Sequence, residues 1–131
     1  RVIVLISDGE CQEGTTWESI LIATKHKLNN LIIIVDYNKI QALSRLEDAL
    51  PLESLKSKFK AFNCECYEVK NGHSFKSLIK FLKLNQSKMP KVFIVNTIKG
   101  KGIKEFENDP IWHARKLKDE DVKIAKRRLK V

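Results

Sequence analysis

The fold is decided first by residues 2–9, VIVLISDG, where an apolar run stops at an acidic turn. A second run, LIIIVDYN at residues 31–38, ends in the same way. Both runs are short and rich in β-branched residues, which predicts buried strands at 2–6 and 31–36. The carboxyl ends of parallel strands form the edge of a sheet where ligands bind. Asp8 and Asn38 are therefore expected to be neighbours at that edge if the two strands pair.

Strand and helix patterns alternate along the rest of the chain. The connections are short, apart from a loop expected from Asn38 to Leu50, and Pro51 and Ser74 suit the starts of the helices that follow them. Further strands are expected at 64–69 and 91–96, and helices at 14–28, 52–62, 75–85 and from about Asp119. This alternation predicts an α/β domain with a parallel sheet covered by helices on both faces.

Composition excludes several classes of protein. The chain has 131 residues and an ordinary apolar fraction of 43%, which suits one domain with a real core. It contains no apolar stretch of about 18 residues, so a membrane span is not expected. Its first residue, Arg1, falls in a strand pattern and is not a Met, so we expect a fragment of a longer protein. The three cysteines do not suggest a disulfide framework, and reduced thiols in a cytoplasmic protein are expected.

The formal charge of +9 is concentrated in the C-terminal segment, residues 115–131. One interpretation is a solvated amphipathic helix, and the other is a surface for a phosphate-rich partner or an anionic substrate. No aromatic residues are interleaved with these basic residues, so a nucleic-acid partner is not expected.

The oxygen atoms at the two strand ends suggest a metal site. The Asp8 carboxylate and the Asn38 amide oxygen are suitable ligands for Mg²⁺ or Ca²⁺, and Ile40 is placed to add a backbone carbonyl. Few protein ligands, with places left for phosphate oxygens, are typical of Mg²⁺. Gly9 would allow a phosphate to approach the backbone closely. Taken singly, Asp8 also suits a helix cap and Asn38 a turn.

At this point the sequence resembles the transketolase family. The resemblance rests on the thiamine-diphosphate motif, on the residues that follow its aspartate, and on a later segment similar to separately encoded N-terminal transketolase subunits. The matching residues are SDGECQEG at 7–14, Trp17-Glu18, DYNKI at 36–40, TIKGKG at 97–102, Glu107-Asn108 and Trp112-His113. The resemblance covers nearly the whole chain and implies a thiamine-diphosphate-binding fold, of which residues 1–131 would be the C-terminal part of the diphosphate-binding domain.

The resemblance also implies roles for particular residues. Asp8 and Asn38 match the side-chain Mg²⁺ ligands, Ile40 matches the residue that supplies a backbone carbonyl, and Gly9 matches a backbone contact to the diphosphate. A further three residues would complete the cofactor site. Glu13 matches a catalytic glutamate of the subunit-interface network that links two cofactors. Ile98 matches an apolar residue against the thiazolium, and His113 a catalytic histidine near the diphosphate and the reacting centre.

Other histidines and two departures from the family pattern have plainer interpretations. His113 alone would suit packing, His26 is expected at the surface of a helix, and His73 is expected to be structural. Ser7 replaces the usual first glycine of the motif, and Ala114 replaces a glycine that often follows the histidine. Neither departure removes a metal ligand.

The implied activity is transfer of a two-carbon ketol unit from a ketose to an aldose, with thiamine diphosphate and Mg²⁺ as cofactors. The substrate would be a sugar or sugar phosphate. The partner would be a pyrimidine-binding domain or a C-terminal transketolase subunit, in a homo- or hetero-oligomer such as a dimer. Two alternatives stay open, namely another thiamine-diphosphate enzyme that makes an unusual sugar, and a non-catalytic subunit fragment.

Overall fold

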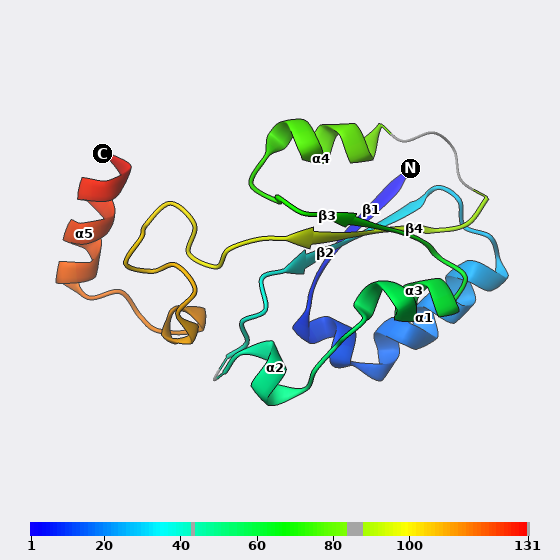
Figure 1. The fold of residues 1–131 in the computed structure, drawn as a ribbon, viewed down its shortest axis with the longest axis horizontal. Coiled ribbons are helices and arrows are strands. Elements are labelled where there is room, and N and C mark those ends of the chain that lie inside the picture. The colour runs from blue at the N-terminus through cyan, green and yellow to red at the C-terminus, as the bar shows by residue number, and fades with distance from the viewer. Residues whose placement is uncertain (43, 84–87, 131) are drawn as a thin grey trace.

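Four parallel strands pair in the order β1-β2-β4-β3. The computed structural model describes residues 1–42, 44–83 and 88–130 of the chain. The strands are β1 (Val2–Ser7), β2 (Leu31–Tyr37), β3 (Glu65–Val69) and β4 (Lys91–Asn96) (Figure 1). They agree with the predicted strands to within one residue at either end. Ser7 pairs with Asp36, so the two acidic strand ends lie side by side as expected.

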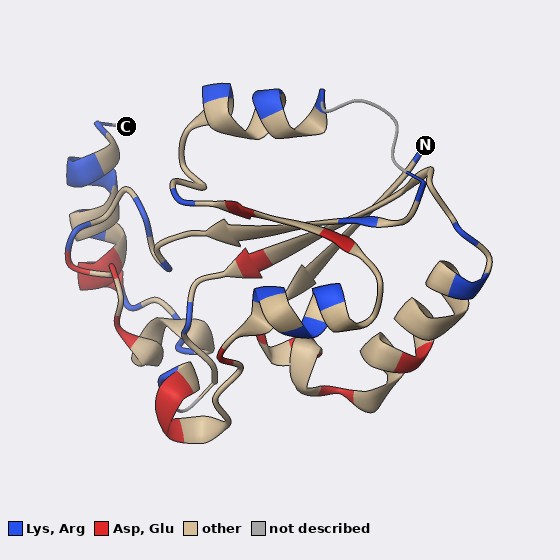
Figure 2. Ribbon diagram, turned by 45° about the vertical axis from the view of Figure 1, so that its right-hand side comes forward, with Lys and Arg blue, Asp and Glu red and all other residues tan. Residues whose placement is uncertain are grey.

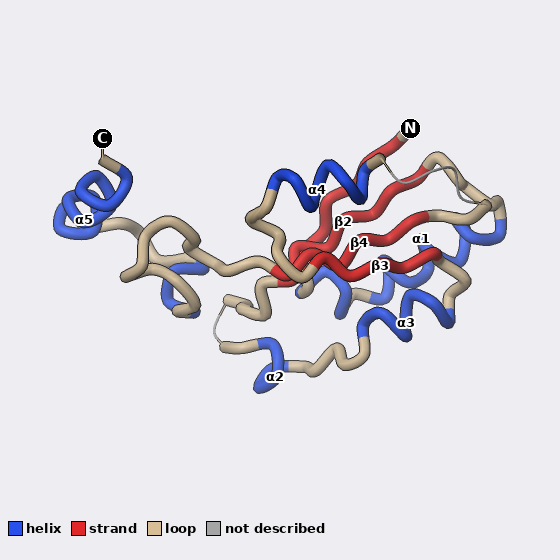
Figure 3. Tube along the Cα trace, turned by 45° about the horizontal axis from the view of Figure 1, so that its top comes forward, coloured by secondary structure: helices blue, strands red, loops and turns tan. Residues whose placement is uncertain are grey.

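Helices cover both faces of the sheet, which confirms the predicted fold class. Helices α1 (Gly14–Lys25) and α3 (Leu55–Ala61) lie against one face, and α4 (Phe75–Leu82) lies against the other (Figures 1 and 3). Connections between parallel strands are right-handed. The chain crosses the sheet in one direction from β1 through β2 to β3, and it then turns back to β4. Helix α4 connects β3 to β4 and therefore belongs on the opposite face.

Each face of the sheet has its own apolar core. Beneath α1 and α3, the fully buried Phe59 lies 5.0 Å from the ring of Trp17, centroid to centroid. On the α4 face, Phe93 packs against Phe81 and is almost fully buried. All three cysteines are free and lie in the first core, where burial raises the pKa of the Cys11 thiol to about 12. The thiols are therefore protonated at neutral pH and poorly reactive.

The structure corrects the expected helix boundaries. The helix predicted at 52–62 behind Pro51 begins only at Leu55, because Ser54 Oγ accepts a hydrogen bond from Ser57 N (3.3 Å) and caps it there. The helix predicted at 14–28 ends at Lys25, since Lys27 adopts a left-handed φ of 50° that closes the helix.

Two further differences concern the loop after β2 and the end of α4. A short helix, α2 (Leu46–Ala49), lies inside the stretch expected to be a loop. Helix α4 is capped by Ser74, as predicted, and reaches Leu82; residues 84–85 of the predicted helix lie outside the described residues.

The C-terminal segment extends away from the sheet and ends in α5 (Asp119–Leu129), which confirms the predicted final helix (Figure 1). Acidic side chains lie in its first turn and basic ones in its last turn, the arrangement that the helix dipole favours (Figure 2). Arg128 pairs with Glu105 at 2.6 Å, so part of the basic charge is neutralised within the chain. Across the described part of the chain, no helix has both the length and the apolar character to cross a membrane.

Strand β1 is an edge of the sheet and is poorly covered. Its side chains point alternately to the two faces. Ile3 on one face and Val4 on the other are both exposed, at 53% and 39%. The strand that delivers Asp8 therefore presents apolar surface beside its free edge.

Gly72 is predicted to be required for stability. A Cβ atom there would lie 2.5 Å from Val95 Cγ1 and 2.8 Å from the Asn96 carbonyl oxygen. The carbonyl is a backbone group, so it cannot easily move away. We expect Gly72→Ala to lower the free energy of unfolding by about 1–3 kcal/mol, measured by urea denaturation.

The matched control is Gly14→Ala. A Cβ there meets only Glu18 Oε1 at 3.8 Å, and the position is helical. This variant should keep the wild-type stability or gain up to about 1 kcal/mol. Equal stability of the two variants would contradict the packing argument.

Candidate functional site

A cavity of about 380 Å³ lies at the carboxyl ends of β1 and β2. Its walls come from four segments of the chain, namely the end of β1 with the 3₁₀-helix η1 (Gly9–Gln12), the end of β2 with the loop after it, the loop after β4, and the 3₁₀-helix η2 (Pro110–His113). The lining residues are Ser7, Asp8, Gly9, Glu10, Glu13, Asp36, Asn38, Ile40, Gln41, Ala42, Lys99 and His113. Six of the seven predicted site residues therefore meet in one place, and Ile98 is the exception.

Asp8 is the buried anion of this cavity. Its side chain is only 2% exposed, and Oδ2 accepts a 2.6 Å hydrogen bond from the backbone N–H of Lys39. This bond joins the end of β1 to the loop after β2. Although Asp8 precedes η1, its side chain makes no capping hydrogen bond to that helix, so the helix-cap interpretation does not apply.

The surroundings of Asp8 make its negative charge costly. Burial raises the pKa of its carboxyl group, and the nearby Asp36 carboxylate adds to the rise. The backbone N–H groups of Lys39 and Gly9 and the charge of Lys99 act in the opposite direction. A buried carboxylate with a raised pKa beside a second carboxylate favours a bound cation.

Asn38 is oriented by its neighbours. Its Nδ2 donates to Asp36 Oδ2 at 3.2 Å, and its Oδ1 accepts from Ile40 N at 2.9 Å. Asp36 is held in turn by Thr97, whose Oγ1 donates to Asp36 Oδ1. Because Nδ2 of the Asn38 amide faces Asp36, its Oδ1 faces the backbone of the loop at Ile40. The loop after β4 thereby supports the predicted ligand on the loop after β2.

Gly9 and Gln41 leave room for an anionic group. A Cβ on Gly9 would meet nothing nearer than Gln41 Nε2, at 3.7 Å, so the protein does not fill the space above this backbone. Gln41 Nε2 is buried and, within the described part of the chain, has no hydrogen-bond acceptor. Lys99 brings a positive charge to the same cavity. An unused donor and a cation beside an open backbone are suitable for phosphate oxygens.

Ser7 fits the site although it departs from the family pattern. Its N–H and its Oγ donate to Glu10 Oε2 at 2.8 Å and 2.9 Å, and Glu10 N donates back to Ser7 Oγ at 3.2 Å. These bonds lower the pKa of the Glu10 carboxyl. The hydroxyl group is therefore engaged by the first turn of η1, which stabilises the turn that places Asp8 and Gly9.

Glu13 and His113 lie at the more open part of the cavity. Both are exposed, and they come from opposite ends of the sequence. Glu13 is the N-cap residue that precedes α1. His113 ends η2 and follows Trp112, whose ring stacks on Phe106 at a centroid distance of 3.9 Å. Two exposed polar side chains at the mouth of a cavity are suitable for contacts with a ligand or with a second protein surface.

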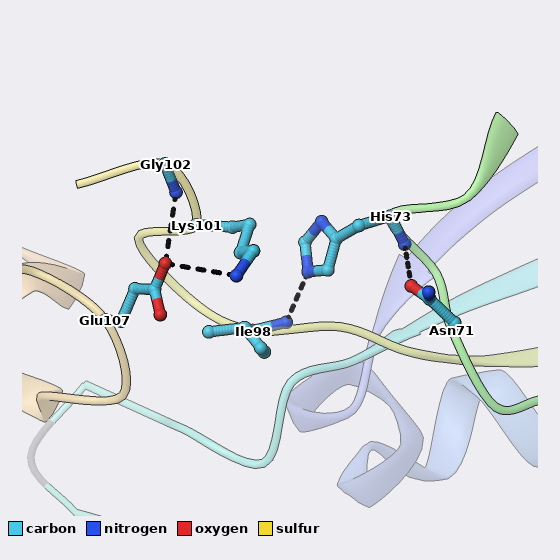
Figure 4. A network of polar contacts seen from close by, with 6 residues as sticks. All are labelled: Asn71, His73, Ile98, Lys101, Gly102 and Glu107. Atoms are coloured by element: carbon cyan, nitrogen blue, oxygen red, sulfur yellow. Dashed lines mark hydrogen bonds and ion pairs between the residues drawn. The ribbon is translucent and has the colours of Figure 1, made fainter. Parts of the chain in front are cut away.

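Ile98 is placed next to the cavity but does not line it. Its side chain is half-buried, and its backbone N–H donates to His73 Nε2 at 2.8 Å (Figure 4). The prediction that Ile98 contacts a cofactor stays untested. The residue after it, Lys99, is the one that reaches the cavity wall.

Five polar residues of the cavity were not among the predicted site residues, namely Ser7, Glu10, Asp36, Gln41 and Lys99. Asp36 was visible as the acidic end of the second strand, and the expected pairing of the first two strands was the signal that could have placed it near Asp8. In the structure it pairs with Ser7. Lys99 lies in the matching segment TIKGKG, but no sequence signal showed that its side chain, or that of Gln41, would reach the cavity.

The donor set suits a hard divalent cation shared with a phosphate ligand. Asp8 and Asn38 provide oxygen atoms, and the backbone around Ile40 provides carbonyl groups. In residues 1–42, 44–83 and 88–130, no group of three or more His, Cys, Asp and Glu side chains is arranged to hold a metal ion. A closed zinc-type site is therefore not found, and a cation here would depend on ligand oxygens to complete its coordination.

Comparisons with known proteins identify the family. The whole chain, residues 1–131, matches the family model described as transketolase, thiamine diphosphate binding domain. An apulose-4-phosphate transketolase subunit of Actinobacillus succinogenes is 39% identical over 131 residues, which cover 99% of this chain and 47% of that relative. The 6-deoxy-6-sulfo-D-fructose transketolase subunit SqwG of a Clostridium species is 35% identical, over 95% of this chain and 46% of that relative.

A solved structure agrees with these relatives. The transketolase of Campylobacter jejuni superposes with a TM-score of 0.88 and 32% identity, over 99% of this chain and 20% of that one. The chain belongs to the transketolase family and forms a thiamine diphosphate binding domain, or part of one. It spans about half the length of the two subunit relatives.

Replacing Asp8 with a neutral isostere is predicted to stabilise the cofactor-free protein. The folded-state pKa of Asp8 is raised, so stability falls as pH rises from the unfolded pKa through the folded one, and it stays lower at neutral pH. An asparagine side chain at this position would keep an oxygen acceptor for Lys39 N without the charge. We expect Asp8→Asn to raise the urea midpoint at pH 7, and the gain to vanish below the ordinary carboxyl pKa of 3.8.

The exposed Asp48 provides the matched control, since Asp48→Asn should show no comparable gain. A wild-type or reduced midpoint for Asp8→Asn at pH 7 would contradict the proposed cost of the buried charge.

Proposed function

We propose that this chain supplies the diphosphate-binding half of a transketolase active site, which transfers a two-carbon ketol unit from a ketose to an aldose. One observation carries the proposal: residues from four separate segments, among them Asp8, Asn38 and His113, line a single cavity at the ligand-binding edge of the sheet. Family membership supports the same interpretation, because the family model describes a thiamine diphosphate binding domain.

Asp8, Asn38 and the carbonyl of Ile40 are proposed to hold Mg²⁺, which would join the chain to the diphosphate. The raised pKa of Asp8 supports this role, since a bound cation would relieve the cost of a buried carboxylate. The Gly9 backbone, Gln41 Nε2 and Lys99 are proposed to contact diphosphate oxygens. Together they would supply hydrogen bonds and positive charge to the diphosphate, in addition to the charge of the metal.

Thiamine diphosphate, when bound, supplies the carbon nucleophile and the electron sink that ketol transfer requires. The residues of this chain would bind and orient it by its diphosphate end. Ile98 is proposed to add an apolar contact to the thiazolium ring. His113, exposed at the mouth of the cavity, is proposed to act as a catalytic residue near the diphosphate and the sugar, where its imidazole can donate or accept a proton.

The rest of the site is proposed to come from a pyrimidine-binding domain, on a separate C-terminal transketolase subunit or on the same polypeptide. The two similar relatives named as subunits support a multi-subunit assembly. Exposed Glu13 would lie at the interface between the two halves of the dimer. The uncovered apolar side chains of β1 support the proposal that a further part of the assembly covers this edge.

Residues 1–131 are therefore proposed to be the C-terminal part of a diphosphate-binding domain. We propose a sugar or sugar phosphate as substrate, because the relatives are named as transketolases for apulose-4-phosphate and for 6-deoxy-6-sulfo-D-fructose. A cytoplasmic location is proposed on the basis of the three free, buried cysteines.

Removing the Asp8 charge is predicted to abolish Mg²⁺-dependent cofactor binding. In the complete protein with its partner subunit, Asp8→Asn should weaken thiamine diphosphate binding by at least about a hundredfold, because even residues behind a metal ligand contribute about ten- to a hundredfold. Isothermal titration calorimetry with and without Mg²⁺ measures the effect. Asp48→Asn should bind like the wild type, and unchanged affinity in Asp8→Asn would refute the metal assignment.

A further inference from the structure

The turn between β3 and α4 holds the loop that follows β4. Within the turn, Asn71 Oδ1 accepts from His73 N at 3.0 Å. Gly72 N donates to the Asn96 carbonyl at 2.8 Å, and His73 Nε2 accepts from Ile98 N at 2.8 Å (Figure 4). The turn therefore contacts the chain on both sides of Thr97, at the place where β4 gives way to the loop.

The contact from His73 requires one state of its imidazole ring. A backbone N–H can only donate, so Nε2 must be the nitrogen without a proton, and the ring proton lies on Nδ1. Protonated histidine has no acceptor and cannot make this bond. Gly72 is what brings the ring into range, because any Cβ there would collide with the end of β4.

Three consecutive residues of the held loop each serve the candidate site differently. Thr97 Oγ1 donates to Asp36, which accepts from the Asn38 side chain. Ile98 makes the bond to His73, and Lys99 lines the cavity. A displacement of Ile98 would therefore move both the support of Asn38 and the cation at the cavity wall.

The far side of the same loop is held independently. The Lys99 carbonyl accepts from Asn108 N at 3.0 Å, and Glu107 accepts from Gly102 N at 3.3 Å and pairs with Lys101 Nζ at 3.3 Å (Figure 4). These contacts fix the loop from residue 99 onward. The hydrogen bond that Ile98 N donates to His73 fixes the beginning of the loop, between the end of β4 and the cavity.

We propose that His73 is a positioning residue for the cofactor site, whose neutral Nε2 holds the Ile98 amide and so places Thr97 and Lys99. The proposal rests on the proposed function, since it concerns the same cavity. It differs from the expectation that His73 is merely structural, because it assigns the effect to one acceptor atom and to one loop.

Three variants of the complete protein with its partner subunit test the proposal. His73→Phe removes the acceptor and keeps a ring, whereas His73→Gln carries an oxygen that can reach the position of Nε2. His26→Phe, at the exposed end of α1, is the matched control. Thiamine diphosphate affinity at saturating Mg²⁺ is measured by calorimetry, and exchange of the Ile98 amide proton is followed by nuclear magnetic resonance.

We expect His73→Phe to weaken thiamine diphosphate binding about three- to tenfold, the effect of losing one hydrogen bond, and to speed exchange of the Ile98 amide. His73→Gln should restore both, and His26→Phe should alter neither. Wild-type affinity in His73→Phe, or equal losses in the Phe and Gln variants, would overturn the positioning role while leaving the proposed function intact. Failure of the wild-type assembly to bind the cofactor would instead overturn the proposed function, and the positioning role with it.

Discussion

The hydrogen bond from the Lys39 amide to the buried Asp8 carboxylate is the contact on which the candidate site depends. It joins the end of an edge strand to the loop after a central strand, across 31 positions of sequence. Lys39 takes a left-handed φ of 64° in this loop, a conformation that costs a lysine about 1 kcal/mol or more. Both the strained backbone and the buried charge oppose folding, so the cavity is maintained by the packing of the strands behind it. Such arrangements are typical of functional sites, where stability is exchanged for a defined geometry.

The sheet and the meeting of the site residues were predictable because they follow from strong local signals. Strands buried on both faces read as continuous apolar runs, and parallel pairing puts their carboxyl ends together. Helix ends were less predictable. Pro51 suits a first helical turn, yet Ser54 caps the helix because its side chain can satisfy a backbone donor. Lys27 ends α1 in a left-handed conformation that glycine usually signals, so the sequence contained no warning.

The parts of the site that escaped prediction depend on tertiary contacts. Lys99 belongs to the matching segment TIKGKG, but it is one of 25 Lys and Arg residues, and nothing local predicts that its side chain reaches the cavity. Gln41 matters because its amide nitrogen is buried without an acceptor among the described residues, which no sequence pattern expresses. Ile98 was selected for its side chain, whereas the structure shows its backbone N–H in a specific contact. Ser7, a departure from the family motif, is accommodated by a reciprocal pair of bonds with Glu10 that only the turn geometry discloses.

The exposed edge of β1 has a thermodynamic consequence for the proposed assembly. Asp8 directly follows this strand, so the free energy of completing the sheet and the free energy of binding a cation are linked. A partner that covers β1 and holds its end in place would raise ligand affinity, and a bound ligand would tighten the partner by the same factor. The same uncovered strand, left without a partner, is a template for pairing between copies of the chain. Assembly would then protect against aggregation and prepare the site for its ligand in a single step.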